Sequence, residues 1–87
     1  MRRRVVVHGR VQGVFFRDSL RRLANENGVS GWARNTREGT VEAVFEGDRD
    51  GVERLLSFSR TGPRDARVDE VEVYEEEPEG LSGFSIR

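Results

Sequence analysis

A β-hairpin is predicted by residues 29–46, VSGWARNTREGTVEAVFE. From Val29 to Thr36, small or apolar residues alternate with polar ones, which is typical of a strand with one buried face. The same alternation returns from Thr40 to Glu46. The turn between them, Arg37 to Gly39, is short, and its glycine can supply the positive φ angle that a tight hairpin needs. The middle of the chain is therefore expected to form two antiparallel strands.

One helix is predicted on each side of this hairpin. The inward-facing residues of the first helix recur at helical spacing, with charged residues on the other face; they are Phe16, Leu20, Leu23 and Asn27. Gly28 then occupies the position of a left-handed helix cap. Asp48 is a suitable N-cap for the second helix, which Gly62 and Pro63 should end. The buried residues of the second helix are predicted to be Val52, Leu55, Leu56 and Ser59.

Two further strands complete the pattern. The β-branched run from Arg4 to His8 predicts a central strand, and the alternation from Arg67 to Tyr74 predicts another. The end of the chain, Phe84 to Arg87, is a candidate for a short edge strand. The resulting order, β-α-β-β-α-β, predicts an α+β, ferredoxin-like sandwich, in which two helices cover one face of an antiparallel sheet.

The predicted connections also fix the order of strands in space. Right-handed crossovers place the strands in the order 4-1-3-2. The first and second strands then run in the same direction, so their C-terminal ends share one edge of the sheet. The loop that begins at Gly9 and the side chain of Asn35 should meet at that edge.

Composition excludes several classes of protein. With 87 residues the chain has room for one domain, residues 1–87, and the absence of cysteine excludes disulfides and Cys-ligated metal sites. No His, Cys or carboxylate cluster has metal-ligand spacing, so no metal or cofactor is expected. With a net charge of −1, the chain lacks the positive field on which sequence-independent nucleic-acid binding depends. No segment is apolar enough to cross a membrane, and the first apolar run is too short for an export signal. We expect a cytoplasmic monomer.

Two charged runs are interpreted as solvated surface. Arg2, Arg3 and Arg4 are predicted to form the exposed start of a strand, with a basic patch as the alternative. The run from Glu75 to Glu77 is predicted to be a solvated strand end and not a metal site. Trp32, a single tryptophan in a strand, is expected to serve packing.

A candidate anion site follows the first strand. Gly9 and Gly13 precede a helix start, where glycines let successive amides point inward and free N–H groups attract negative charge. Glycines at such positions also form ordinary turns, and the spacing differs from that of the nucleotide-binding loop. Arg17 favours the anion site, because a guanidinium in the first turn can bind two phosphate oxygens and opposes the helix dipole. A solvated helix arginine remains the alternative.

Two motifs resemble one known family. The segment Gly9-Arg10-Val11-Gln12-Gly13-Val14-Phe15-Phe16-Arg17 resembles the signature loop of acylphosphatases. Gly31 to Thr36, followed by Gly39 to Glu42, resembles the second motif of that family, although the turn residues Arg37 and Glu38 are larger than the family pattern suggests. Weaker similarity continues through Gly62-Pro63, Ala66-Arg67-Val68 and Phe84-Ser85-Ile86-Arg87. The resemblance covers nearly the whole chain and implies the same sandwich fold.

The resemblance also implies a function and a site. The expected reaction is metal-independent hydrolysis of a small acyl phosphate to a carboxylate and inorganic phosphate. By position, Arg17 corresponds to the phosphate-binding arginine of the family and Asn35 to the asparagine that orients the attacking water. The implied phosphate cradle is the backbone of Gly9, Arg10, Val11, Gln12, Gly13, Val14 and Phe15.

Three alternatives compete with these expectations. His8 directly precedes the loop and could be a general base, but a single histidine at a strand end is more often structural. An RNA-recognition domain has the same element order but needs exposed aromatic residues, whereas the third strand here should present Glu42, Val44 and Glu46 outward. A non-catalytic module of the same fold that binds phosphate or carbamoyl phosphate stays as the second hypothesis.

Overall fold

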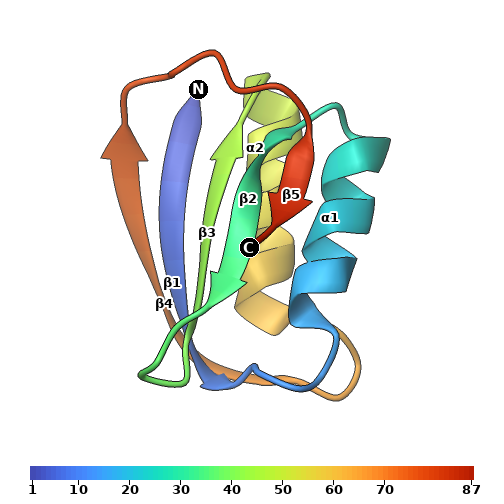
Figure 1. The fold of residues 1–87 in the computed structure, drawn as a ribbon, viewed down its shortest axis with the longest axis vertical. Helices are drawn as coiled ribbons and strands as arrows, with labels where there is room; N and C mark the ends of the chain where they lie inside the picture. Colours follow the sequence, from blue (N-terminus) through green and yellow to red (C-terminus); the bar gives the residue numbers. More distant parts are fainter.

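Five strands and two helices form the chain in the computed structural model, which describes residues 1–87. In chain order they are β1 (Arg2–Arg10), α1 (Phe16–Glu26), β2 (Ser30–Asn35), β3 (Val41–Glu46), α2 (Arg49–Thr61), β4 (Arg67–Glu76) and β5 (Phe84–Ile86). The strands form one sheet in the order β4-β1-β3-β2-β5, with both helices on one face (Figure 1). The predicted sandwich and its 4-1-3-2 order are confirmed. β5 adds a short parallel strand outside β2.

The ends of the strands differ from the prediction. β1 continues past His8, because Gly9 and Arg10 pair with Val68 and Arg67 of β4 after a bulge. Two residues that were expected in the phosphate loop therefore belong to the strand. Only glycine fits at position 9, since a Cβ there would lie 2.1 Å from the carbonyl oxygen of Arg67. The same long pairing carries β4 two residues beyond its predicted end.

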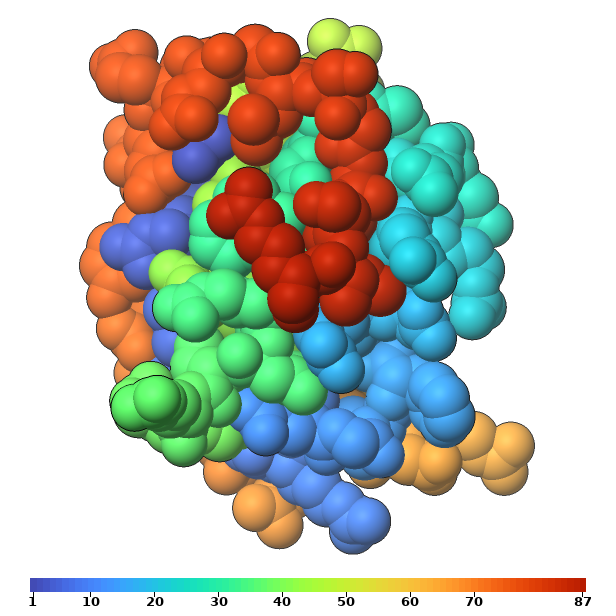
Figure 2. Space-filling view, in the orientation of Figure 1, coloured from blue at the N-terminus to red at the C-terminus, as the bar shows by residue number.

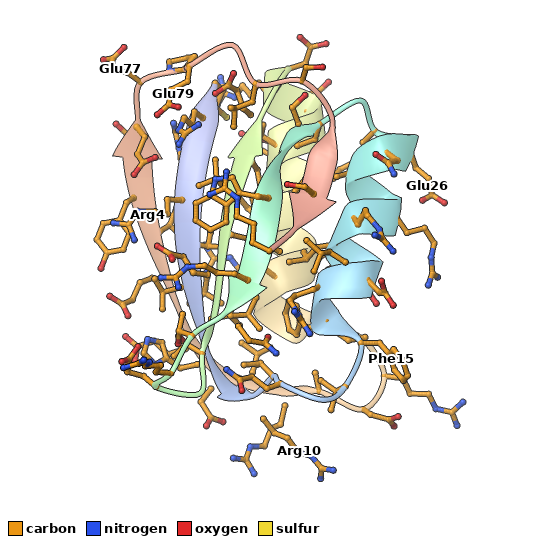
Figure 3. The ribbon with its side chains drawn as sticks, in the orientation of Figure 1. Arg4, Arg10, Phe15, Glu26, Glu77 and Glu79 are labelled. Carbon is orange, nitrogen blue, oxygen red and sulfur yellow. The ribbon has the colours of Figure 1, made fainter.

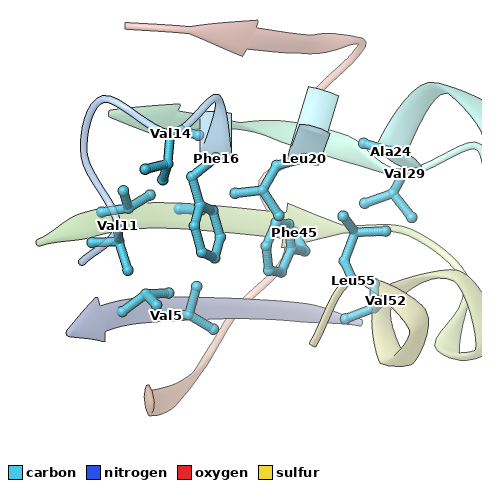
Figure 4. Packing of buried hydrophobic residues seen from close by; sticks show 14 residues of the cluster. Val5, Val11, Val14, Phe16, Leu20, Ala24, Val29, Phe45, Val52 and Leu55 are labelled. Carbon is cyan, nitrogen blue, oxygen red and sulfur yellow. The ribbon is translucent and has the colours of Figure 1, made fainter. Parts of the chain in front are cut away.

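The hydrophobic core lies between the helices and the sheet (Figure 4). α1 buries Phe16, Leu20 and Ala24, which follow one another at intervals of four residues. Leu23, predicted to face inward, is only partly buried because Ala24 lies on the face toward the sheet. Asp48 precedes α2 as predicted, but its side chain makes no capping hydrogen bond. Asn27 and Leu56, which were also predicted to face inward, are likewise only partly buried.

The face of the sheet that the helices do not cover, here called the open face, carries arginines in ion pairs and not arginines exposed to water. Arg2 was predicted to be solvated, but it is only 6% exposed and binds Glu46, Glu76 and Glu79 at 3.3, 2.9 and 3.4 Å. The register of β1 explains the correction, because it places Arg2 directly opposite Glu46 of β3 and Glu76 of β4. Arg4, on the same face, binds Glu76 at 3.0 Å and lies over a tyrosine ring (Figure 3).

Val44 lies on this open face, as predicted, but it is fully buried. Its cross-strand neighbours are Arg4 and Trp32. The guanidinium of Arg87 lies 4.5 Å from the centre of the Trp32 ring. Trp32 therefore packs under an arginine and beside a valine, consistent with its predicted packing role.

Glu46 anchors the connection between β4 and β5. Its carboxylate accepts hydrogen bonds from the backbone N–H groups of Glu79, Gly80 and Leu81 at 2.9, 2.7 and 2.9 Å. These contacts lower the pKa of the Glu46 carboxyl to about 2, and the hydrogen bond from the Glu79 amide is the largest cause. The other two amides and the Arg2 side chain also lower it, whereas burial alone would raise it. This anchored connection leads to β5 and so to Ile86.

The low pKa of Glu46 predicts an acid-sensitive contribution to stability. Because the pKa falls from its ordinary value of 4.5 to about 2 in the folded chain, the contribution is complete above the unfolded pKa and is lost as the pH falls toward 2. We expect urea unfolding to show a larger loss of stability between pH 7 and pH 3 in the wild type than in Glu46→Gln. Glu77→Gln, at an exposed residue without an ion pair, is the matched control and should behave as the wild type. Equal losses in wild type and Glu46→Gln would contradict this interpretation.

Candidate active site

A cavity of about 460 Å³ lies where four segments meet: the loop of residues 11–15, the start of α1, the end of β2 and the end of β5. In the space-filling view, the C-terminal segment in red, the end of β2 in green and the start of α1 in blue converge on the visible face (Figure 2). The lining residues are Val11, Gly13, Phe15, Phe16, Arg17, Asp18, Asn35 and Ile86. Arg17 and Asn35 therefore line one cavity, at the sheet edge where the topology was expected to bring the Gly9 loop and Asn35 together.

The loop is held at both ends and in its middle. Val11 and Val14 are buried in the core and fix its path. Between them, the side-chain amide of Gln12 donates hydrogen bonds to the carbonyl oxygens of Thr36 and Thr40, at 2.8 and 3.0 Å. This pair of bonds ties the loop to the β2–β3 hairpin, which also carries Asn35. No local sequence pattern indicates this tether, because it joins residues 24 and 28 positions apart.

The backbone of the loop offers a row of free donors. None of the amide N–H groups of residues 11–15 donates a hydrogen bond within the protein. Gly13 and Phe15 both have left-handed backbone conformations, with φ angles of 73° and 63°. Alternating handedness of this kind makes concave nests of N–H groups that bind anions. Gly9 and Arg10, by contrast, lie in β1 and pair with β4.

Arg17 lies in the first turn of α1, directly after this loop. Its guanidinium makes no hydrogen bond or ion pair, although most of the arginines on the open sheet face are paired. The one acidic residue that lines the cavity, Asp18, binds Arg21 at 2.9 Å. The positive charge of Arg17 is therefore not neutralised by a protein carboxylate, and it adds to the positive end of the helix.

Asn35 is the last residue of β2 and pairs with Val41 of β3. Its side chain is partly buried and makes no hydrogen bond, so both its carbonyl oxygen and its NH₂ group can interact with a small molecule. The rigid hairpin behind it, tied to the loop by Gln12, fixes the position of this amide relative to the free N–H groups.

His8 lies away from this cavity. Its ring hydrogen-bonds Glu72 of β4, and the hydroxyl of Tyr74 donates to the same carboxylate. Both bonds lower the pKa of Glu72, and the bond from Tyr74 is the larger cause. All three side chains belong to the open face of the sheet, whereas the cavity lies on the side of the helices. This geometry favours the structural interpretation of His8 over a role as general base.

The model of the acylphosphatase family matches residues 3–86. The chain belongs to the acylphosphatase family. The acylphosphatase of Thermococcus kodakarensis is 56% identical over 80 residues, which cover 92% of this chain and 88% of that protein. The family and the enzyme class that the two motifs predicted are both confirmed.

The acylphosphatase fold of this chain is also found in solved structures. An acylphosphatase from Coxiella burnetii has a TM-score of 0.94 at 41% identity, over 99% of this chain and 90% of that one. Full-length HypF, solved in a phosphate- and nucleotide-bound form, has a TM-score of 0.90 at 26% identity. The match spans 99% of this chain but 11% of the HypF chain, so the same fold also forms one part of a much larger protein.

Two residues that line the cavity, Phe15 and Ile86, were not predicted to contribute side chains to the site. Phe15 was expected to contribute only its backbone, yet the residue is 75% exposed, with its side chain accessible to solvent beside the cavity that it helps to line. Ile86 reaches the cavity because β5 pairs in parallel with β2, where Ile86 lies opposite Ala33. The edge strand was expected, but its partner was not. The one signal in the sequence was the similarity of Phe84 to Arg87 to the closing residues of the family.

Neither helix has the length and apolar character needed to cross a membrane.

Proposed function

We propose that this chain hydrolyses acyl phosphates to a carboxylate and inorganic phosphate in the cavity between the β1–α1 loop and β2. The observation that carries the proposal is the combination of an uncompensated Arg17 and a run of free amides in one cavity with Asn35. These are the groups that a phosphoryl transfer to water requires, because such catalysis consists mainly of positioning and electrostatic stabilisation.

Arg17 and the loop backbone bind the phosphoryl group in this proposal. The guanidinium is always charged and can donate to two phosphate oxygens at once. The free N–H groups of residues 11–15 complete the cradle, and Gly9 and Arg10 hold its first turn against β4. Donors fixed in advance stabilise the charge of the transition state without reorganising during the reaction.

Asn35 orients the attacking water. Its side-chain oxygen can accept a hydrogen bond from the water, which leaves a lone pair of the water directed at phosphorus. The water oxygen forms a bond to phosphorus as the bond to the acyl oxygen breaks, and the electron pair of that bond leaves with the carboxylate. An uncharged amide is too weak a base to keep the proton, so the proton passes to a phosphoryl oxygen and leaves with inorganic phosphate.

The leaving group needs no acid from the protein. A carboxylate is stable without a proton at neutral pH. Asp18 lies in the cavity but is paired with Arg21, and no role is assigned to it. The positive charge in the site comes from Arg17 and the amides, so the proposed reaction requires no metal.

Hydrolysis of acetyl phosphate in excess EDTA tests this proposal. We expect the purified protein to keep its full rate in the chelator, and added Mg²⁺ or Zn²⁺ should not increase it. A rate that is lost in EDTA and restored by one divalent ion would refute the metal-free mechanism. Phosphate binding without measurable turnover would instead favour a non-catalytic phosphate- or carbamoyl-phosphate-binding module.

A further inference from the structure

The charged residues of the chain are distributed unevenly between the two ends of its long axis, which measures 30 Å. The β1–α1 loop lies at one end, together with the β2–β3 turn and the α2–β4 connection (Figure 1). These three connections form the loop end of the molecule. The loop and Arg17, which line the cavity, belong to this end.

Three arginines of the loop end have no partner in the protein. Arg10 is the last residue of β1, Arg37 lies in the β2–β3 turn, and Arg64 lies in the α2–β4 connection. All three are exposed, and none forms an ion pair or a side-chain hydrogen bond. The arginines on the open face, in contrast, bind glutamates; they are Arg2, Arg4 and Arg34.

Neither helix capping nor strand pairing accounts for these three charges. Arg60 also lies near the loop end, but in the last turn of α2, where a positive charge stabilises the negative end of the helix. Arg10 lies directly opposite another arginine, Arg67 of β4, and like charges at such positions are destabilising. Arg37 occupies a turn position where a smaller residue was expected. The loop end therefore carries positive charge that the fold does not require.

Positive charge is in excess at the loop end, although the whole chain carries a net charge of −1. The acidic residues of the three connections are Glu38 and Asp65. Asp18, at the start of α1, is paired with Arg21. The two free carboxylates are fewer than the three arginines, and Arg17 adds a further positive charge.

The opposite end of the molecule is acidic, and Figure 3 shows Glu26 and Glu77 there. Its exposed acidic residues without an ion pair are Glu26, Asp48, Asp50 and Glu77. Arg54 and the amine of Met1 offset part of this charge. The two ends are separated by most of the 30 Å length, whereas the Debye length is about 8 Å at physiological ionic strength. The acidic end therefore does not cancel the positive potential at the cavity.

We propose that Arg10, Arg37 and Arg64 attract the anionic substrate to the cavity through their long-range field and so raise kcat/KM. The proposal rests on the proposed function, because it takes an acyl phosphate, with about two negative charges at neutral pH, as the ligand. The field of such a cluster concentrates counter-ions at the site without contact to the reacting atoms. Bound substrate therefore reacts at an unchanged rate.

The expected effect follows from the size of the molecule, whose two shorter dimensions are 22 and 21 Å. A charge at the loop end thus lies about 10 Å from the middle of that end, where one unit charge raises the local concentration of a dianion about two- to threefold at low ionic strength. Three such charges together are expected to contribute about tenfold, because Glu38 and Asp65 oppose them.

The triple variant Arg10→Gln, Arg37→Gln, Arg64→Gln tests the proposal. We expect kcat/KM for acetyl phosphate to be about tenfold below that of the wild type at about 10 mM ionic strength, and within about twofold of it at about 0.3 M. The loss should be in KM, with kcat unchanged. The corresponding triple lysine variant keeps all three charges and should match the wild type at both ionic strengths.

The matched control replaces three arginines at the acidic end, Arg3, Arg49 and Arg54, by glutamine. It changes the net charge by the same amount and should lower kcat/KM by less than about twofold. A loop-end glutamine variant equal to the wild type at low ionic strength would overturn the proposal, and so would an equal loss in the control. A lysine variant as impaired as the glutamine variant would also overturn it, because the arginines would then act by specific contact.

Binding of inorganic phosphate gives a second readout that does not depend on turnover. Its Kd should rise in the loop-end glutamine variant by a similar factor at low ionic strength and should stay unchanged in the lysine variant. If the wild type failed to hydrolyse acetyl phosphate, the proposed function would fail, and the Kd values alone would decide whether the three arginines attract anions. An equal Kd in wild type and glutamine variant would overturn the proposal in either case.

Discussion

Replacement of Arg17 by glutamine is expected to lower kcat/KM for acetyl phosphate by at least about a thousandfold. One fixed donor to a developing anion already contributes about 10²–10³ in kcat, and Arg17 supplies two donors and a full charge. No other side chain in the cavity can replace that charge, because Asn35 is neutral and Asp18 is negative. Arg17→Lys should recover little activity, since a single ammonium cannot copy the planar fork of the guanidinium.

The control for this variant is Arg22→Gln. Arg22 is an exposed arginine of α1 that forms no ion pair and does not line the cavity, and its replacement changes the net charge by the same amount. It should retain wild-type kinetics. An Arg17→Gln enzyme within about tenfold of the wild type would remove Arg17 from the proposed mechanism.

Replacement of Asn35 by alanine is expected to lower kcat by about 10²–10³, the effect typical of losing one preorganised polar group. Binding of phosphate should change little, because the amides of residues 11–15 and Arg17 are unaffected. The diagnostic result is the separation of the two quantities: a large loss in kcat with a nearly constant inhibition constant for inorganic phosphate.

Asn25→Ala provides the matched control, since Asn25 is exposed on α1 and makes no side-chain hydrogen bond. It should leave kcat unchanged. If Asn35→Ala lowered phosphate affinity and kcat by the same factor, Asn35 would be a binding group and would not orient the water.

The order of the strands could be predicted because it depends on local patterns and on handedness. Alternation around the Arg37–Gly39 turn identified the hairpin, and right-handed crossovers then placed β1 beside β3. The burial of Arg2 could not be predicted in this way. It depends on partners 44 and 74 residues away, Glu46 and Glu76, and a charged run at the start of a chain gives no sign of them.

The same distinction applies to the candidate site: what the topology sets could be predicted, and what the path of the loop sets could not. The meeting of the loop after β1 with Asn35 followed from the parallel direction of β1 and β2, which is a property of the topology, and Arg17 comes directly after that loop. The Gln12 tether and the left-handed Phe15 depend on the exact path of the loop. Ile86 depends on which strand accepts β5, and a three-residue strand carries too little pattern to decide that.

The most direct test of the phosphate site is the effect of inorganic phosphate on thermal unfolding of the wild type and of Arg17→Gln. At one hundred times its Kd, a ligand that binds only the folded state adds about 2.7 kcal/mol of stability. For a domain of this size, each kcal/mol raises Tm by about 4–8 °C. We expect a clear increase in Tm for the wild type, larger than that caused by chloride at equal ionic strength, and no such increase for Arg17→Gln. An equal increase in both proteins would mean that phosphate binds elsewhere, and it would contradict the assignment of the loop and Arg17 as the phosphate site.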